Sequence, residues 1–590
     1  MNDKLKSILH TAWNEPRHFF FWLAMLSLCG FIAAAGAAAL TVPITFLAFV
    51  ALGWLLCLAI SIPAFILAWI PPVRRLFSWL LHRRFMVLGC LVTLVALFYA
   101  IEDWRGRRAW QSYKHAWEAK GERFDLASLA PPPVPNDQNF FETPLWADMH
   151  FVMTNRSAVW SDTNMGNRVI FSAYVPQGKD APSPGSWLKA QRVDLPAWQA
   201  FYRGSNNLFA AQGGQPTNYF PVAKEPQTPA ADVLLALSRF ATNRQLLIAA
   251  SARPQARFWI NYDDGFFMLF PHLARLKASS QYLSLHAVAA LKAGDRETAL
   301  EDIKLSFRLV EALRGEPSLI SFKVRIAMMQ RALQLVWEGL ADRQWTEAEL
   351  SAIESELGKL DFLAHYHLAM RGERACGVWG VDFIRKVGIF WLNEMSAPRE
   401  DSGPFDLEQF LGKATSWLVP AGWFDQNKLS LCRKYEKYLL PLVGGPDRRI
   451  VSAAATKEAD SALGRQGARP YDLFSGMLLS PSPLGGFAND CARAQSSVDL
   501  ARVACALERY RLANGQFPNT LDPLAPRFIA KPPHDIINGQ PLKYRLTDDD
   551  QFVLYSVGWN GIDDGGKVEL LKSGNPDVQK GDLVWRYPAR

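Results

Sequence analysis

The chain lacks the short motifs that identify most hydrolases and nucleotide-binding enzymes. Its 590 residues contain no GxSxG elbow, no HExxH zinc motif and no GxGxxG fingerprint. The seven cysteines include no CxxC pair, which removes support for the common zinc sites and for thioredoxin-like chemistry. An active site assembled from distant carboxylates leaves no such motif. Enzymatic activity is therefore unsupported by sequence rather than excluded.

Charged residues are missing from three apolar runs near the N-terminus. The runs are Phe19 to Leu40, Ile44 to Ile70 and Phe85 to Ile101, and none contains Asp, Glu, Lys or Arg. Each is close to the roughly 20 residues that a helix needs to cross a bilayer. Buried helices of a soluble core are the alternative, but they rarely combine this length with this lack of charge. We predict three transmembrane helices within 19–101, preceded by a cytoplasmic segment, 1–18.

Arginines flanking the runs predict their orientation. The expected loop from Pro71 to Arg84 carries four Arg and no acid, whereas the link from Thr41 to Pro43 is uncharged. Short loops rich in Lys and Arg stay in the cytoplasm. Three further arginines after the third run oppose this orientation, but reversing it would export the four-Arg loop. The C-terminal bulk is therefore predicted to be extracytoplasmic.

The net charge is +8, but the basic residues do not form one stripe interleaved with aromatic residues, so we expect no nucleic-acid partner. Much of the excess lies beside the apolar runs. Anionic lipid headgroups of the membrane are the expected partner for it.

The remainder divides by composition and periodicity. We expect a juxtamembrane helix and a Pro-rich connector, an irregular or mixed segment, an α-helical domain, a linker and an α+β domain, at 102–135, 136–228, 229–465, 466–489 and 490–590 respectively. Within the irregular segment, Val169 to Tyr174 is a candidate strand. The fold class is mainly α.

Amphipathic patterns in the helical domain predict hairpins. Tyr282 to Leu313 reads as helix, turn at Gly294 and Asp295, then helix, because Gly can end one helix and Asp can cap the next. The hairpin resembles a tetratricopeptide-type unit at Ala289, Gly294 and Ala299. A second hairpin is expected at Leu319 to Ala341 and Glu347 to Leu357, without a clean 34-residue recurrence. We predict a helical hairpin stack.

One cluster in this domain could suggest catalysis or metal binding: His365, His367, Glu373 and Arg374. On a helix the two histidines point roughly 200° apart, so they cannot both bind one ion without distortion. We therefore interpret the four as polar residues of a solvated or interhelical face.

The tail has the most specific pattern. A helix beginning near Ser496 is expected to end at Asn514 and Gly515, and two strands, Leu542 to Leu546 and Phe552 to Val557, are expected to form a hairpin. The hairpin leads into the loop Gly558 to Gly566, which is dense in oxygen ligands and in glycine.

These pieces resemble the globular part of the major pseudopilins of type II secretion systems. The matching blocks are ALERYRLANGQFP, DIINGQPLKY and YSVGWNGIDDGG, at Ala506 to Pro518, Asp535 to Tyr544 and Tyr555 to Gly566. The resemblance implies a β-hairpin domain on a long helix, with calcium bound after the hairpin by Asn560, Asp563 and Asp564. A solvated acidic turn without an ion is the alternative. A pseudopilin begins with a leader, and its apolar helix joins the globular domain directly. Neither feature is expected in this chain. We therefore predict a borrowed module instead of a fibre subunit.

Together these patterns predict a membrane-anchored protein of the bacterial inner membrane and envelope. We expect a protein-binding or scaffolding role, with protein partners, and a link to a secretion or pilus-like system. The alternative is an extracytoplasmic hydrolase whose site lies between the helical and irregular segments. A pocket containing paired carboxylates or a His–carboxylate pair would favour the hydrolase.

Overall fold

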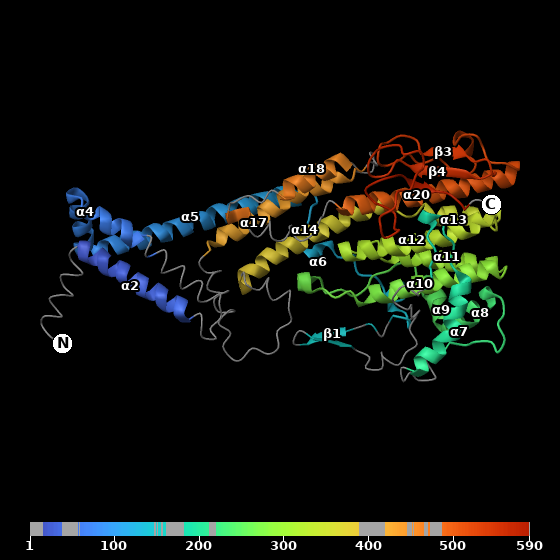
Figure 1. Cartoon of the computed structure of the whole chain (residues 1–590), viewed down its shortest axis with the longest axis horizontal. Coiled ribbons are helices and arrows are strands. Elements are labelled where there is room, and N and C mark those ends of the chain that lie inside the picture. Colours follow the sequence, from blue (N-terminus) through green and yellow to red (C-terminus); the bar gives the residue numbers. More distant parts are fainter. Residues whose placement is uncertain are drawn as a thin grey trace. The chain divides into compact units, whose positions relative to one another are not determined.

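The chain forms two compact units, drawn in the computed structural model of Figure 1. Unit 1 comprises residues 1–111 and 382–426, and unit 2 comprises 112–381 and 427–590. The structure describes residues 16–37, 57, 60–146, 149, 151–154, 157–160, 182–211, 220–388, 419–444, 451, 453–464, 470–472 and 486–588. Described elements are mainly helical, as predicted.

Unit 1 contains the apolar runs. The first lies in α2 (Pro16–Ala37), the end of the second is helical over 60–67, and the third opens α5 (Arg84–Glu118). From Phe85 onward α5 is long and apolar enough to cross a membrane, and its apolar window has no buried residue. The expected continuation of the third run into a charged, aromatic helix is confirmed, because α5 is unbroken through Glu118.

The prediction of a loop between the second and third apolar runs is wrong. Pro71 to His82 forms a helix, α4, with Pro at its first turn, where the missing N–H is not needed. The axes of 60–67 and 71–79 differ by 120°. The segment has an apolar and a basic face, so helix formation places Val73 and Phe77 on one side and exposes Arg74 and Arg75.

Two glycines let α5 and the start of α17 (Ala421–Lys434) approach closely within unit 1. A methyl group added to Gly106 would collide with the backbone of Gly422, and one added to Gly422 would collide with the backbone of Glu102. The Asp103 carboxylate accepts a hydrogen bond from the Gly422 N–H at 2.8 Å. The Trp423 indole donates to Glu102 at 3.0 Å.

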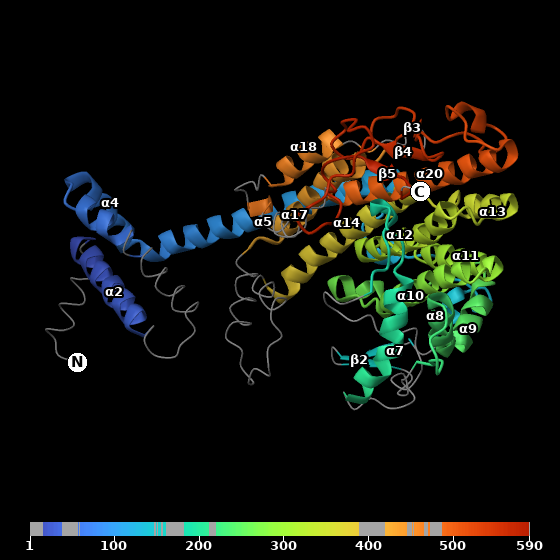
Figure 2. The ribbon, with the colours of Figure 1, turned by 45° about the vertical axis from the view of Figure 1, so that its right-hand side comes forward.

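Unit 2 has a helical core. It includes the hairpin of α10 and α11, with α12 packed against both helices and α13 packed against α11 and α20 (Figures 1 and 2). Their bounds, with those of the neighbouring helices, are Leu195–Ala211 (α7), Pro229–Leu237 (α8), Ala241–Ser251 (α9), Pro271–Lys292 (α10), Arg296–Ala312 (α11), Leu319–Ala341 (α12), Glu347–Leu357 (α13) and Phe362–Val387 (α14), of which α14 continues past this unit.

The hairpin turns use the predicted residues. Gly294 adopts a φ of +87°, a left-handed conformation that side chains disfavour. Asp295 caps α11 by accepting from the Thr298 N–H at 3.0 Å. At the start of α13, Thr346 and Glu349 exchange hydrogen bonds in a capping box. The first predicted hairpin is therefore present. The second prediction is right in its helix bounds, but α13 packs against α20 and α11 instead of forming a hairpin with α12.

The tail packs onto this core within unit 2. The long helix α20 (Gly486–Asn514) contacts α12 and α13 along a face containing Leu500, Val503 and Leu507. The predicted hairpin forms as β3 and β4, and an unpredicted third strand, β5, pairs with β4; their bounds are Lys543–Leu546, Phe552–Ser556 and Leu583–Trp585.

Asp535 joins two of the sequence blocks of the tail. Its buried carboxylate accepts hydrogen bonds from the Ser556 hydroxyl at 3.0 Å and from the Val557 N–H at 2.9 Å. A hydrogen bond from the Trp337 indole to the Arg586 carbonyl, at 2.9 Å, connects α12 to the end of β5.

The segment predicted to be irregular is only partly so. It contains α7 and an antiparallel strand pair, β1 (Phe151–Thr154) and β2 (Ser157–Trp160), which sequence reasoning missed. The candidate strand Val169 to Tyr174 lies outside the described residues, as does most of the expected linker 466–489.

The shorter elements are α6 (Leu126–Leu129), η1 (Phe140–Glu142), η4 (Trp187–Lys189), η6 (Ser238–Phe240), η7 (Tyr262–Phe267), the π-turn η8 (Tyr435–Leu439), η9 (Leu440–Leu442), α18 (Ala453–Gly464), η10 (Pro470–Asp472) and η11 (Asp522–Leu524).

We predict that Gly106→Ala or Gly422→Ala destabilises unit 1 by about 1–3 kcal/mol, because overpacking forces the two backbones apart. Thermal unfolding of the detergent-solubilised full chain measures the loss. Gly89→Ala is the matched control on α5, since nothing lies within 4 Å of its added methyl group. Equal behaviour of Gly89→Ala and Gly106→Ala would contradict the close crossing.

Candidate functional site

A pocket in unit 2 lies between the helices and the chain that leads into α7. It is a hollow of about 540 Å³, including space open to solvent. Pro182, Pro184 and Val193 precede α7, and the other lining residues come from α7, α8, α10 and α12; these are Trp198, Leu237, Gln281, Tyr282, Ser284, Leu285 and Arg331. The predicted hydrolase site was placed between these same two regions.

The chain before α7 is fixed to α12 by a polar stripe. Gln330 accepts from the Trp187 indole at 2.9 Å, Gln334 donates to the Gln191 carbonyl at 3.1 Å, and Glu338 accepts from the Val193 N–H at 2.7 Å. The three side chains are spaced by four residues, so they share one face of the helix. These three hydrogen bonds therefore hold this wall of the pocket in a fixed position.

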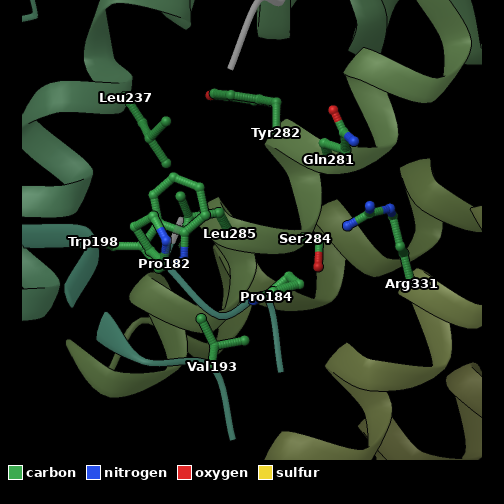
Figure 3. Close-up of a pocket in the computed structure, with 10 residues that line it drawn as sticks. All are labelled: Pro182, Pro184, Val193, Trp198, Leu237, Gln281, Tyr282, Ser284, Leu285 and Arg331. Carbon is green, nitrogen blue, oxygen red and sulfur yellow. The ribbon is translucent and has the colours of Figure 1, made fainter. Parts of the chain in front are cut away.

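The opposite wall is fixed by α7. The Trp198 indole donates to the Ser183 carbonyl at 3.3 Å and its ring stacks with Tyr202. Pro182, Leu237 and Trp198 line one side of the hollow, and Gln281 and Arg331 lie on the other (Figure 3). The two sides have different chemistry, one apolar and one polar.

Arg331 is the cation of the pocket. It extends from α12 toward Ser284 and Gln281 of α10 (Figure 3). Among the described residues, no hydrogen bond or ion pair engages its guanidinium, and burial alone lowers its pKa. Its nitrogens are not among the buried atoms that lack a partner, so water reaches them in the free protein. An anionic ligand could take the place of that water and accept from the guanidinium.

Arg325, six residues earlier on the same helix, shows the contrasting arrangement. Its fully buried guanidinium pairs with Glu311 at 2.5 Å and donates to the carbonyls of Val310 and Asp361, both at 3.1 Å. It also lies over the Phe362 ring. Six residues rotate a helix by about 600°, so the two arginines face directions roughly 120° apart. Arg325 is a structural ion, and Arg331 has no corresponding partner.

The pocket can therefore bind one acidic group together with an apolar body. Arginine suits carboxylate because its planar fork donates two parallel hydrogen bonds. The proline, leucine and tryptophan side chains can cover apolar atoms of the same ligand. The lining contains neither a carboxylate nor a histidine, and it offers no general base of the usual kind.

A second hollow, between α8, α9, α10 and α11, holds a histidine–carboxylate pair. His286 Nδ1 lies 2.6 Å from Asp302, whose other oxygen accepts from Arg244 at 2.8 Å. Tyr282 stacks on His286. Among the described residues, no hydroxyl or thiol is hydrogen-bonded to His286. Because Asp302 is fully buried and joins α9, α10 and α11, its pairing is explained by structure alone.

The predicted interhelical interpretation of the 365–374 cluster agrees with the structure, which separates its members. His365 is buried, with Nε2 donating to the Glu316 carbonyl and Nδ1 facing Arg325. Glu373 accepts from the Leu319 N–H at 3.3 Å. Arg374 pairs with Glu122 and Glu436, and His367 is only half-buried. The cluster forms no common site.

The predicted calcium ligands lie in one loop but are engaged by their neighbours. The Asn560 side chain donates to Asp564 at 2.8 Å. Asp563 accepts from the Tyr555 hydroxyl and the Gly565 N–H, and it lies 3.3 Å from the Lys543 ammonium. Across the described residues, no three Asp, Glu, His or Cys side chains are arranged to hold a metal. The donors as placed do not form a calcium cage, so calcium stays a prediction and carries no functional argument.

Sequence reasoning missed Arg331 and its pocket. A signal was available: Gln330, Gln334 and Glu338 recur every four residues in the apolar C-terminal half of the helix, with Arg331 next to the first. Such a stripe predicts that a polar segment packs there. It does not reveal which member lacks a partner, because that depends on the fold of a segment more than 130 residues away.

We predict opposite stability effects for the two arginines of α12. Arg331→Met removes an unpaired, partly desolvated charge and keeps apolar volume, so the free energy of unfolding should rise or change by less than about 1 kcal/mol. Arg325→Met leaves two carbonyls without their donor and leaves Glu311 with Arg314 as its remaining ion-pair partner, and it should cost about 3–5 kcal/mol. Denaturant unfolding of the full chain distinguishes them. A comparable loss in both variants would show that Arg331 is structural.

We also predict that stability falls in acid because of His365. Burial and the neighbouring Arg325 lower its pKa from 6.5 to about 3. The folded state thus binds fewer protons than the unfolded state, so stability is complete above pH 6.5 and declines toward pH 3, by up to about 1.4 kcal/mol per pH unit.

His365→Gln should flatten this pH dependence, because the amide can donate to Glu316 and accept from Arg325 without titrating. Unfolding measured at several pH values between 4 and 7 provides the test. His115→Gln, at an exposed position of α5, is the control. An unchanged slope in His365→Gln would contradict the assignment.

Comparisons with known proteins give no further identification. No family model, curated protein or solved structure matches the chain. The functional argument therefore depends on the geometry of unit 2.

Proposed function

We propose that the chain is a membrane-anchored envelope protein that binds other proteins, and that the Arg331 pocket receives a carboxylate-bearing apolar segment of a partner. The supporting observation is the unpaired guanidinium at one side of an apolar-walled hollow. A peptide chain offers such a ligand through an acidic side chain or its C-terminus. The helical hairpins provide a rigid frame for it.

The proposed attachment to a membrane is based on α5. One helix suited to crossing a membrane supports attachment to a bilayer. We further propose three crossings, a cytoplasmic N-terminus and an extracytoplasmic unit 2 in the bacterial inner membrane. The acid-free arginines between 71 and 84 support this orientation.

The tail is proposed to be a pseudopilin-like module, which connects the protein to a secretion or pilus-like system. Support comes from the three sequence blocks and from the hairpin that follows a long helix. The hairpin of α10 and α11 is likewise proposed to be tetratricopeptide-like. Both resemblances are consistent with a role in protein binding.

A hydrolase is the second candidate, because His286 and Asp302 form a His–carboxylate pair within a hollow. Such a pair can activate water or a hydroxyl group. The pairing of Asp302 with Arg244 and the lack of a bound nucleophile among the described residues make this candidate weaker. The pocket offers a guanidinium that no described residue binds, whereas the members of the dyad already bind each other.

We predict that a photo-crosslinking residue at Val193 captures a partner protein in intact cells, and that Arg331→Met abolishes the adduct. The same residue placed at exposed Glu297, away from the pocket, is the control. Addition of 4-phenylbutyrate to membranes should reduce the adduct at least about 10-fold more effectively than its neutral amide, because a charge-assisted pair contributes ~1.5–3 kcal/mol.

An adduct that is unaffected by Arg331→Met would place the interaction outside the pocket. Equal competition by acid and amide would show that the pocket is merely apolar. Absence of any adduct at Val193, with efficient incorporation, would overturn the proposal of a protein partner at this site.

A further inference from the structure

The surface of α4 in unit 1 combines exposed apolar and basic residues. Leu76 and Trp79 are 54% and 48% exposed, although they are among the most apolar residues of the helix. At 100° per residue they lie on the side next to Arg75. Phe77, on another side, packs against Phe20 of α2 at 4.8 Å between ring centroids. The helix is thus attached to α2 and keeps an amphipathic face free.

Two arginine–tryptophan pairs flank this face. The Arg83 guanidinium lies 5.6 Å from the Trp79 ring, and that of Arg17 lies 4.4 Å from the Trp69 ring. Trp69 itself is 61% exposed. Tryptophan prefers the boundary between hydrocarbon and headgroups, and arginine extends its charge from there toward water. Both pairs have the chemistry of a membrane interface.

Within the part of unit 1 that the structure describes, no acidic residue pairs with the positive charge of this region. No Asp or Glu occurs between Pro16 and Ile101, whereas five Arg do. Among the described residues of unit 1, Arg17, Arg75 and Arg83 form no ion pair, and Arg17 Nε is buried without a hydrogen-bond partner. The apolar face and the uncompensated charge therefore require an occupant that is apolar on one side and anionic on the other.

We propose that α4 lies in the membrane interface and that Arg17, Arg75 and Arg83 bind phosphates of anionic phospholipids. Leu76 and Trp79 insert among the acyl chains at the headgroup boundary, and the arginines satisfy the phosphates through charge-assisted hydrogen bonds. Charge complementarity selects anionic over zwitterionic lipid. This site is independent of the proposed partner pocket in unit 2 and of which side of the membrane α4 occupies.

The lipid site explains the bend before α4. Were 60–67 and 71–79 one broken span, Arg74 and Arg75 would be carried into the bilayer, at a cost of about 2.5 kcal/mol or more each. A helix along the interface avoids this cost. The two prolines at its start, Pro71 and Pro72, end the preceding helix and provide the change of direction.

Native mass spectrometry of the full chain in detergent tests the site. Phosphatidylglycerol is titrated against phosphatidylcholine, and we expect preferential retention of phosphatidylglycerol. The variant Arg75→Gln with Arg83→Gln should weaken phosphatidylglycerol binding roughly 30-fold, at about 1 kcal/mol per arginine.

The matched control is Arg107→Gln with Arg108→Gln. It also removes two arginines close to the apolar part of α5, and Arg108 also lies over a tryptophan, Trp104. Acidic Glu102 and Asp103 are nearby in that case. Selectivity lost only in the α4 variant supports the proposal. Equal binding of both lipids by the parent chain, or equal loss in both variants, would overturn it.

Discussion

The contrast between two arginines on α12 organises unit 2. Arg325 is satisfied by a carboxylate, two carbonyls and an aromatic face, and it connects α12 to α11 and to the start of α14. Arg331 faces the chain before α7 and meets no acid. A buried charge is tolerated when it is paired and costly when it is not. One helix therefore carries, within two turns, an arginine fully engaged by its neighbours and an arginine that no described residue engages.

Other buried cations of the unit follow the structural pattern. Arg374 is shared by Glu122 and Glu436, which joins the segment after α5 to α14 and to the π-turn. Arg308 donates to the carbonyls of Arg253 and Gln255. Arg244 pairs with Asp302. Each of these three arginines is held by its neighbours, whereas the guanidinium groups of Arg331 and Arg493 make no hydrogen bond or ion pair with the described residues; of these two, Arg493 has Asp490 and Asp577 nearby.

Local patterns predicted much of the fold because their causes are local. The turn at Gly294 and Asp295 follows from one positive φ and one cap, and both lie within four residues of each other in sequence. The bounds of α12 were predicted from an apolar face that its neighbours bury. The helix α7 was missed because Pro196, Gly204 and Asn206 weaken its pattern, and packing of Trp198 and Tyr202 against unit 2 compensates for this.

The Arg331 pocket was harder to predict because it is defined by a contact that Arg331 does not make. An alternation of polar residues along α12 indicated that something packs there, yet the partner chain before α7 was expected to be irregular. Whether Gln330, Gln334 and Glu338 found partners, and Arg331 did not, depends on where Trp187, Gln191 and Val193 lie in space. The same limit applied to α4, where composition predicted a cytoplasmic basic loop and the segment instead forms a helix that exposes Leu76 and Trp79 beside Arg75. In both places arginine without an acid is what remains once the fold has paired the other charges, and an external anion is the simplest way to satisfy it.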